Sequence, residues 1–260
     1  VSNLKDMNFI FTIAGRGSRL SKAGIQVPKP LVKVKGKELF IWAMSSFHYS
    51  KNDNIYIISF KSHEIRKYLE KKIQIIYPQC NIYWQELNEI TNGQLSTTIK
   101  AIDHFHIDGS IIIHNCDSYF NGKDLCEVDI EDSKDLFGII PCFEANGEHW
   151  SFVKVKENNI AIKVKEKIRI SNNCSIGTYF FSSTIQLKEL ANKYFNQIDS
   201  MTNEFYIAPL YDYAIKKGKK VIICEAPGAK VFGTADELAQ AFDIELSQVI
   251  INNDPSRLSY

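Results

Sequence analysis

The sequence predicts an α/β fold in which helices cover both faces of a mostly parallel central sheet. Short apolar runs alternate with amphipathic segments over residues 7–120. This alternation is typical of parallel strands joined by helical crossovers. The chain has 260 residues, of which 45% are hydrophobic and 23% charged, so it resembles an ordinary globular protein with enough length for a large core.

The elements are predicted from the period of the apolar residues. In the first half, strands are expected at residues 9–14, 54–60, 81–84 and 110–115, and helices at 37–49, 63–72 and 95–105. After Asp117 the pattern changes to a mixture of strands and helices, with Thr234 as an N-cap. Strands are expected there at 136–141, 151–155, 160–164, 175–181 and 220–225, and helices at 185–195, 205–217 and 234–242.

Charge and cysteine content exclude several classes of protein. Lys and Arg number 31 against 30 Asp and Glu, and this balance argues against a general nucleic-acid binder. No apolar run approaches the ~18–20 residues of a membrane span, and the first residues do not resemble a secretory signal.

The six cysteines form no C-x-x-C pair, so we expect buried free thiols in a reducing cytoplasm.

The segment that follows the first predicted strand has the composition of an anion-binding loop. It reads Ala14-Gly15-Arg16-Gly17-Ser18-Arg19. The two glycines allow close approach of backbone N–H groups to an anion, and the guanidinium of Arg19 suits phosphate oxygens. The spacing matches neither the Walker A pattern nor the dinucleotide fingerprint.

Two further residues have the chemistry of a phosphate and metal site. Lys29 lies between Pro28 and Pro30, which restrict its backbone; the alternative is a simple rigid loop. Asp117 follows an apolar strand, at the sheet edge where ligands of open α/β sheets bind. A carboxylate there suits Mg²⁺, although a turn or helix-capping role would also place an Asp at this position.

Taken together, these segments resemble the sugar-phosphate nucleotidylyltransferase family, which opens with A-A-G-x-G-T-R followed by P-K-P. The similarity covers nearly the whole chain and is closest to short members from capsule and surface-polysaccharide gene clusters. A cytidylyltransferase of the CTP:phosphoglutamine type is one such member. The other matching segments are residues 93–98 (GQLSTT), Glu166-Lys167, residues 171–181, residues 203–206 (NEFY) and residues 233–238 (GTADEL).

The resemblance implies a single domain over residues 1–260 with a three-layer Rossmann-like nucleotidyltransferase fold. Residues 7–120 would form the half that binds the nucleoside triphosphate, and residues 121–260 a mixed half that binds the acceptor. Arg19, Lys29 and Asp117 are the implied catalytic residues, with Asp117 holding Mg²⁺. The implied binding residues are Ala14, Gly15, Gly17, Ser18, Arg19, Gly93 and Gln94 for the nucleotide, and Lys167, Glu166 and Glu204 for the acceptor.

The expected reaction is Mg²⁺-dependent transfer of a nucleotidyl group, with CMP favoured, to a small phosphorylated acceptor. The acceptor is a sugar 1-phosphate or a non-sugar phosphate such as phosphoglutamine or phosphocholine. The alternatives are a GT-A-type glycosyltransferase and a non-catalytic nucleotide-binding protein, and self-association is left open. One departure from the family pattern stands out: Val231 occupies the place of a second metal-binding Asp. Glu204, Asp212 and Glu225 are the residues that could replace it.

Overall fold

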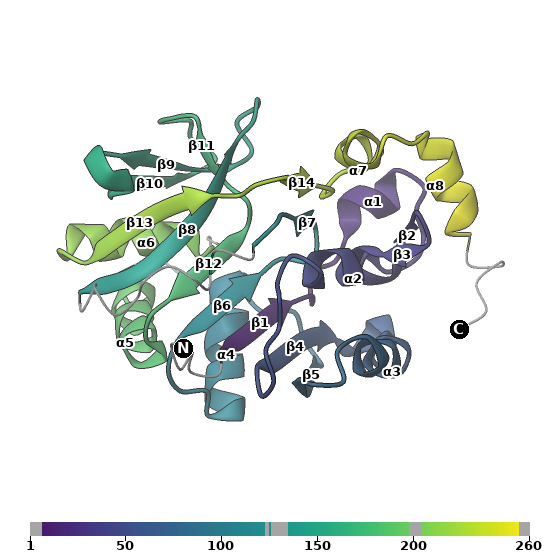
Figure 1. Ribbon diagram of the computed structural model, residues 1–260, viewed down its shortest axis with the longest axis horizontal. Coiled ribbons are helices and arrows are strands. Elements are labelled where there is room, and N and C mark those ends of the chain that lie inside the picture. Colours follow the sequence, from purple (N-terminus) through teal and green to yellow (C-terminus); the bar gives the residue numbers. More distant parts are fainter. Residues whose placement is uncertain (1–6, 123–124, 126–134, 198–203, 255–260) are drawn as a thin grey trace.

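The computed structural model describes residues 7–122, 125, 135–197 and 204–254 (Figure 1). Cys126 and Asn203, which belong to the predictions above, lie outside these residues. The strands are β1 (Asn8–Thr12), β2 (Lys33–Val34), β3 (Lys37–Glu38), β4 (Asn54–Phe60), β5 (Asn81–Leu87), β6 (Ile111–His114), β7 (Ser118–Tyr119), β8 (Leu136–Glu144), β9 (Ser151–Val155), β10 (Ala161–Glu166), β11 (Asn173–Ser175), β12 (Thr178–Phe181), β13 (Lys220–Glu225) and β14 (Lys230–Val231).

The helices lie between these strands and after the last of them. The α-helices are α1 (Ser18–Lys22), α2 (Leu39–Met44), α3 (Arg66–Ile76), α4 (Gln94–Phe105), α5 (Thr184–Phe195), α6 (Ala208–Lys216), α7 (Ala235–Phe242) and α8 (Leu246–Asn252). Short 3₁₀ turns occupy Lys29–Leu31, Lys61–His63 and Glu157–Asn159. No helix in the described part of the chain has the length and apolar character needed to cross a membrane.

Ten strands form one mixed sheet, in the order β10-β9-β11-β8-β12-β6-β1-β4-β5 with β13 beside β8. In the first half of the chain, β6, β1, β4 and β5 are all parallel. Strand β12 joins the edge of this group antiparallel to β6, and the strands beyond it pair mostly antiparallel. The predicted α/β fold is therefore confirmed, with the parallel strands in the first half and the mixed part after Asp117.

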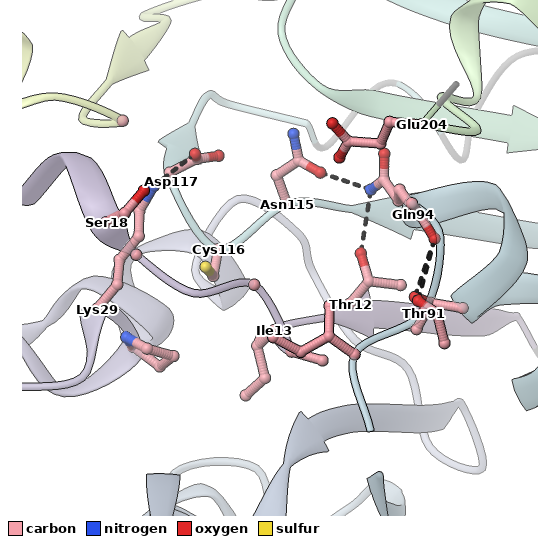
Figure 2. Close-up of a pocket in the computed structure, with 18 of the residues that line it drawn as sticks. Thr12, Ile13, Ser18, Lys29, Thr91, Gln94, Asn115, Cys116, Asp117 and Glu204 are labelled. Carbon is pink, nitrogen blue, oxygen red and sulfur yellow. Dashed lines mark hydrogen bonds and ion pairs between the residues drawn. The ribbon is translucent and has the colours of Figure 1, made fainter. Parts of the chain in front are cut away.

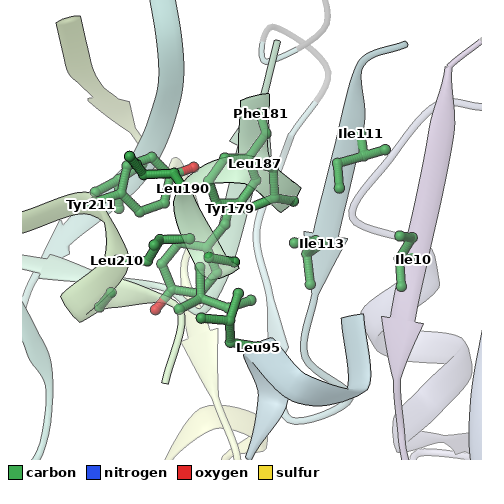
Figure 3. Close-up of a cluster of buried hydrophobic side chains, with 14 of the residues drawn as sticks. Ile10, Leu95, Ile111, Ile113, Tyr179, Phe181, Leu187, Leu190, Leu210 and Tyr211 are labelled. Atoms are coloured by element: carbon green, nitrogen blue, oxygen red, sulfur yellow. The ribbon is translucent and has the colours of Figure 1, made fainter. Parts of the chain in front are cut away.

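Helices cover both faces of the sheet, because successive side chains of a strand point to opposite faces. Ile10 of β1 packs with residues of α4, α5 and α6 (Figure 3). Its neighbours Phe9 and Phe11 pack on the other face with residues of α2 and α3. The same alternation occurs in β6, where Ile111 and Ile113 face one cluster and Ile112 the other. These two cores give the sandwich of three layers.

A third apolar cluster joins α7 and α8 to α1; Figure 1 shows these three helices near one another. Phe242 of α7 and Val249 of α8 pack there with Leu20 of α1. The side-chain oxygen of Asn253 accepts a hydrogen bond from the backbone N–H of Lys33 at 2.6 Å, and its amide donates to the Lys33 carbonyl at 2.9 Å. The C-terminal helices therefore hold the segment that follows Lys29.

The helix predicted at residues 37–49 is shorter than expected, because its first residues form a strand. Lys37 and Glu38 pair with β2 around a turn at Lys35 and Gly36, both of which have positive φ. The prediction at 63–72 also begins too early: Glu64 has a φ of 50°, and α3 starts at Arg66. The prediction at 205–217 starts three residues early, because α6 begins at Ala208.

The strand predicted at 175–181 is divided into β11 and β12 at Gly177. The φ of this glycine is 83°, and a Cβ there would lie 2.3 Å from the Asn115 amide nitrogen. Such a contact is too close for any other residue. The break turns the chain past the end of β6, where the polar residues of the site gather. Helices α1 and α8 were not predicted, whereas the N-cap of α7 at Thr234 is confirmed, with a complete capping box to Glu237.

Candidate active site

A hollow of about 380 Å³ lies at the carboxyl ends of β1 and β6 (Figure 2). We call it the nucleotide hollow, after the predicted nucleotide-binding residues that line it. Its position agrees with the rule that ligands of open α/β sheets bind at the carboxyl edge of the strands. It is lined by Thr12, Ile13, Ala14, Gly15, Gly17, Ser18, Arg19, Lys29, Pro30, Ile90, Thr91, Gly93, Gln94, Thr97, Asn115, Cys116, Asp117, Glu204, Tyr206 and Gly233.

The glycine loop after β1 forms one wall of the nucleotide hollow. Gly17 has a φ of 63° and is the N-cap of α1, and a Cβ on it would lie 3.1 Å from the Lys29 Cβ. The loop therefore packs against the residue that follows Pro28. A Cβ added to Gly15 would have no other atom within 4 Å. All seven predicted nucleotide-binding residues line this hollow.

Lys29 and Asp117 form an ion pair, with 2.6 Å between Lys29 Nζ and Asp117 Oδ2. Burial favours the neutral form of both groups, but their mutual attraction outweighs it. The pKa of Lys29 is therefore raised and the pKa of Asp117 lowered from their ordinary values. Both groups are charged at neutral pH, 88 residues apart in the sequence.

Gln94 is the first residue of α4, and it lines the nucleotide hollow. Its Nε2 donates to Asn115 Oδ1 at 2.5 Å and to Thr12 Oγ1 at 3.1 Å (Figure 2). The adjacent Gly93 has a φ of 103°, and a Cβ there would lie 2.6 Å from the backbone N and O of Phe205. With both hydrogens of its amide occupied, Gln94 offers a ligand its oxygen as a hydrogen-bond acceptor.

A second hollow of about 170 Å³ adjoins the first, and we call it the acceptor hollow. Arg19, Asp117 and Tyr206 line both hollows, so a group in one can reach a group in the other at these residues. Gln94, Asn115 and Gly233 also line both hollows. The other residues that line the acceptor hollow come mainly from the mixed half and include His149, Trp150, Ser151, Glu166, Ser175, Tyr179, Val231 and Glu237.

The three predicted acceptor residues are placed differently from one another. Glu166 lines the acceptor hollow, where Ser151 Oγ donates to its carboxylate. Glu204 lines the nucleotide hollow instead, and accepts a hydrogen bond from Tyr206. Lys167 is absent from the described lining of both hollows; its Nζ donates to Tyr206 Oη at 2.8 Å and lies 4.5 Å from the ring centroid. Lys167 therefore contacts the acceptor hollow indirectly, through its hydrogen bond to Tyr206, which lines that hollow.

Of the candidates for a second metal-binding carboxylate, Glu204 lines the nucleotide hollow, as Asp117 does. Asp212 is buried, accepts the Val164 N–H at 3.0 Å and pairs with Lys216. Glu225 ends β13 with an exposed side chain. Neither lines a hollow within the described residues.

Sequence reasoning missed Glu237, a carboxylate that lies close to Gly233, as Asp117 does. A Cβ on Gly233 would lie 3.2 Å from Glu237 Oε2 and 3.3 Å from Asp117 Oδ2. The capping-box pattern Thr234-x-x-Glu237 was a signal for a fixed Glu at this position, but not for its proximity to Asp117.

The residues around Asp117 fit Mg²⁺ in the mode that uses one protein carboxylate and substrate phosphates. Asp117 supplies an ionised carboxylate at the junction of the two hollows. The described residues contain no group of three or more His, Cys, Asp or Glu that could enclose a metal on their own. Such a site suits a cation that arrives with a phosphate ligand rather than a permanently bound ion.

Comparison with known families identifies the class of protein. The model of the Nucleotidyl transferase family matches residues 10–244, and the chain belongs to this family. A crystal structure of a nucleoside-diphosphate-sugar pyrophosphorylase from Vibrio cholerae RC9 is similar, with a TM-score of 0.78 and 25% identity over 90% of this chain and 99% of that one.

Other relatives share the fold at lower identity. The inositol-1-phosphate CTP transferase from T. maritima has a TM-score of 0.66 and 17% identity, over 93% of this chain and 95% of that one. The bifunctional protein GlmU from Campylobacter curvus is 23% identical over 96% of this chain. The chain spans 54% of the length of that relative.

Proposed function

We propose that this protein transfers a nucleotidyl group from a nucleoside triphosphate to the phosphate of a small acceptor and releases pyrophosphate. The observation that carries the proposal is the Lys29–Asp117 ion pair at the junction of two hollows. An oxygen of the acceptor phosphate attacks the α-phosphorus, and the bond from that phosphorus to the bridging oxygen of the leaving pyrophosphate breaks. No covalent intermediate on the protein is needed.

The side chains of the site position the reactants and neutralise their charge. Arg19 and the N–H groups of the Gly15–Gly17 loop bind the β- and γ-phosphates. Lys29 stabilises the negative charge that develops at the α-phosphate. Asp117 holds Mg²⁺, which supplies Lewis-acid stabilisation of the phosphates when bound. Gln94 and Gly93 contact the base.

We further propose CTP as the preferred nucleotide and a surface glycan or its decoration as the destination of the product. The T. maritima neighbour is an inositol-1-phosphate CTP transferase, and this supports the choice of nucleotide. The acceptor is a sugar 1-phosphate or a non-sugar phosphate such as phosphocholine or phosphoglutamine. A phosphate ester fits the acceptor hollow, because Arg19 and Asp117 lie where that hollow meets the nucleotide hollow.

Pyrophosphate release tests this proposal directly. CTP, UTP, GTP, TTP and ATP are each incubated with a panel of phosphate esters, with and without Mg²⁺. We expect pyrophosphate to appear in equal amount to a nucleotide-linked product, only with Mg²⁺, and fastest with CTP. Turnover of a nucleoside diphosphate sugar without pyrophosphate would contradict the proposal. Equal rates with another triphosphate would remove only the preference for CTP.

A further inference from the structure

The loop between β8 and β9 closes the acceptor hollow against α7. His149 Nε2 in this loop lies 2.9 Å from Glu237 Oε1 in the first turn of α7. The other carboxylate oxygen of Glu237 accepts the Thr234 N–H at 2.9 Å. Both residues line the hollow, so this hydrogen bond joins its two walls.

The loop that carries His149 is held in one conformation by its own contacts. Arg169 donates to the carbonyls of Ala145 at 2.7 Å and Gly147 at 2.6 Å. Trp150 Nε1 donates to the Asn146 carbonyl at 2.8 Å, and the Trp150 ring centroid lies 4.1 Å from that of His149. His149 is thus fixed between a tryptophan and a carboxylate, although nearly half of its side chain is exposed.

Beyond the end that faces Asp117, the carboxylates of Glu166 and Glu237 are the acidic groups among the described residues that line the acceptor hollow. Lys167 does not line it but donates to Tyr206, which does, and Arg169 binds loop carbonyls. Arg19 lies at the junction with the nucleotide hollow. Burial raises the pKa of Glu166, because removal from water disfavours its negative charge.

We propose that His149 and Glu237 are specificity residues that restrict the acceptor to small phosphate esters whose other end is neutral or positively charged. This inference rests on the proposed function. Glu166 and Glu237 would accept hydrogen bonds from hydroxyl or ammonium groups at that end, and would repel a carboxylate there. Of the acceptors named above, this excludes phosphoglutamine, whose far end carries a carboxylate. His149 limits the length of the acceptor by closing the outer end of the hollow.

Matched pairs of acceptors that differ by a carboxylate test the inference. The pairs are glucose 1-phosphate and glucuronic acid 1-phosphate, glycerol 3-phosphate and 3-phosphoglycerate, and phosphoethanolamine and phosphoserine. Pyrophosphate release gives kcat/KM, and calorimetric titration gives the affinity for each ester without turnover. Because like-charge juxtaposition in a buried site is costly, we expect the member without the carboxylate to be favoured about tenfold or more.

Two variants examine the residues themselves. Glu237→Gln removes the charge but keeps a side chain that can complete the capping box, so it should reduce the preference within each pair and leave the KM for the triphosphate unchanged. His149→Ala should open the outer end of the hollow and raise kcat/KM for longer phosphate esters relative to short ones. The control is Glu157→Gln, an exposed glutamate outside the described lining of the hollow.

The outcomes separate the two proposals. Equal use of both members of the pairs, preference for the acid, or an unchanged preference in Glu237→Gln would overturn the inference while leaving nucleotidyl transfer intact. Binding of the esters in the expected order without pyrophosphate release would overturn the proposed function and support the description of the hollow. Failure of every ester to bind would overturn both.

Discussion

Lys29 is largely enclosed, with 13% of its side chain exposed, and its ammonium group faces a carboxylate that is itself 31% exposed. Each group keeps the other charged, as the directions of their pKa shifts show. For Lys29 to bind a phosphate, it must exchange some of its contact with Asp117 for the ligand. A triphosphate that carries its own cation makes this exchange possible without leaving either group unpaired.

We expect Lys29→Ala and Arg19→Ala each to lose ~10²–10³ or more in kcat, by analogy with the loss of one preorganised electrostatic contact. The control is Arg16→Ala, which removes an exposed arginine of the same loop that is not part of the described lining. Steady-state rates of pyrophosphate release and far-UV circular dichroism would be measured for all three. Near-normal turnover of a folded Lys29→Ala or Arg19→Ala variant would exclude that residue from the mechanism.

At the scale of elements, hydrogen bonds to the Glu38 side chain link the start of α2 to α3. Its buried carboxylate accepts from Tyr68 Oη at 2.5 Å and from Lys72 Nζ at 2.6 Å. Burial favours the neutral acid, but these hydrogen bonds outweigh it and lower the pKa of Glu38. Because the folded protein holds the ionised form more strongly than the unfolded chain does, this contribution is present above the unfolded pKa and is lost as the pH falls through the folded value.

Glu38→Gln should therefore lower the free energy of unfolding by about 1–3 kcal/mol at pH 7, the value of hydrogen bonds to a charged group. The difference from the wild type should shrink as the pH is lowered below ~4. Urea titrations at several pH values measure it. Glu70→Gln, which removes a pair with 42% of each side chain exposed, should cost at most about 0.5 kcal/mol at any pH. If the difference in the free energy of unfolding between Glu38→Gln and the wild type did not change with pH, this account would be contradicted.

The junction of α4 with the segment before α6 depends on Gly93. Gly93→Ala would place a Cβ 2.6 Å from the Phe205 backbone in addition to the strain of a positive φ. Gly109→Ala meets only the strain, because nothing lies within 4 Å of its Cβ position. We expect Gly109→Ala to cost about 1–2 kcal/mol and to retain nucleotide binding. Gly93→Ala should be less stable and bind the triphosphate more weakly, and similar behaviour of both variants by thermal unfolding and titration would contradict this.

Element types followed from the sequence where periodicity was strong. The strands at 54–60, 151–155 and 220–225 have the predicted bounds, because their apolar residues are continuous or alternate clearly. Helix α1 has only five residues, of which Leu20 is buried, and begins at a left-handed glycine. A helix this short contains too few apolar residues to show a helical period in the sequence. The same holds for α8, where Val249 is the buried residue of seven.

For the site, the resemblance to the family implied that Lys29 and Asp117 belong to the same catalytic site. The structure places them in an ion pair at 2.6 Å, which the sequence did not predict, and their catalytic roles stay predictions. The contact between His149 and Glu237 could not be predicted. It depends on the path of residues 145–150, which carbonyl contacts with Arg169 determine.

At the scale of the whole molecule, residues from both halves of the chain line each hollow, and the C-terminal helices support the segment that follows Lys29. Asn253 is buried and makes hydrogen bonds with both backbone groups of Lys33. These contacts span 220 residues of sequence. Asn253, at the end of α8, therefore holds the segment that follows Lys29 in place, outside the two main apolar cores.

Saturating triphosphate with Mg²⁺, at ~100 times its dissociation constant, should add ~2.7 kcal/mol to the stability of the wild type, or roughly 5–10 °C. Asn253→Ala should show a smaller shift at the same ligand concentration, because the Lys29 segment is less well positioned. Asn252→Ala, which changes the exposed neighbour, is the control. An undiminished shift in Asn253→Ala, measured by differential scanning fluorimetry, would show that α8 does not support nucleotide binding.

The 220-residue separation between Lys33 and Asn253 also has a consequence for synthesis. As the chain leaves the ribosome, β1, β4, β5 and β6 can pair from the first 114 residues, but the contact with Asn253 must await the final residues of the described chain. During synthesis, the segment that follows Lys29 would therefore lack this support until Asn253 had emerged, long after β1, β4, β5 and β6 could pair.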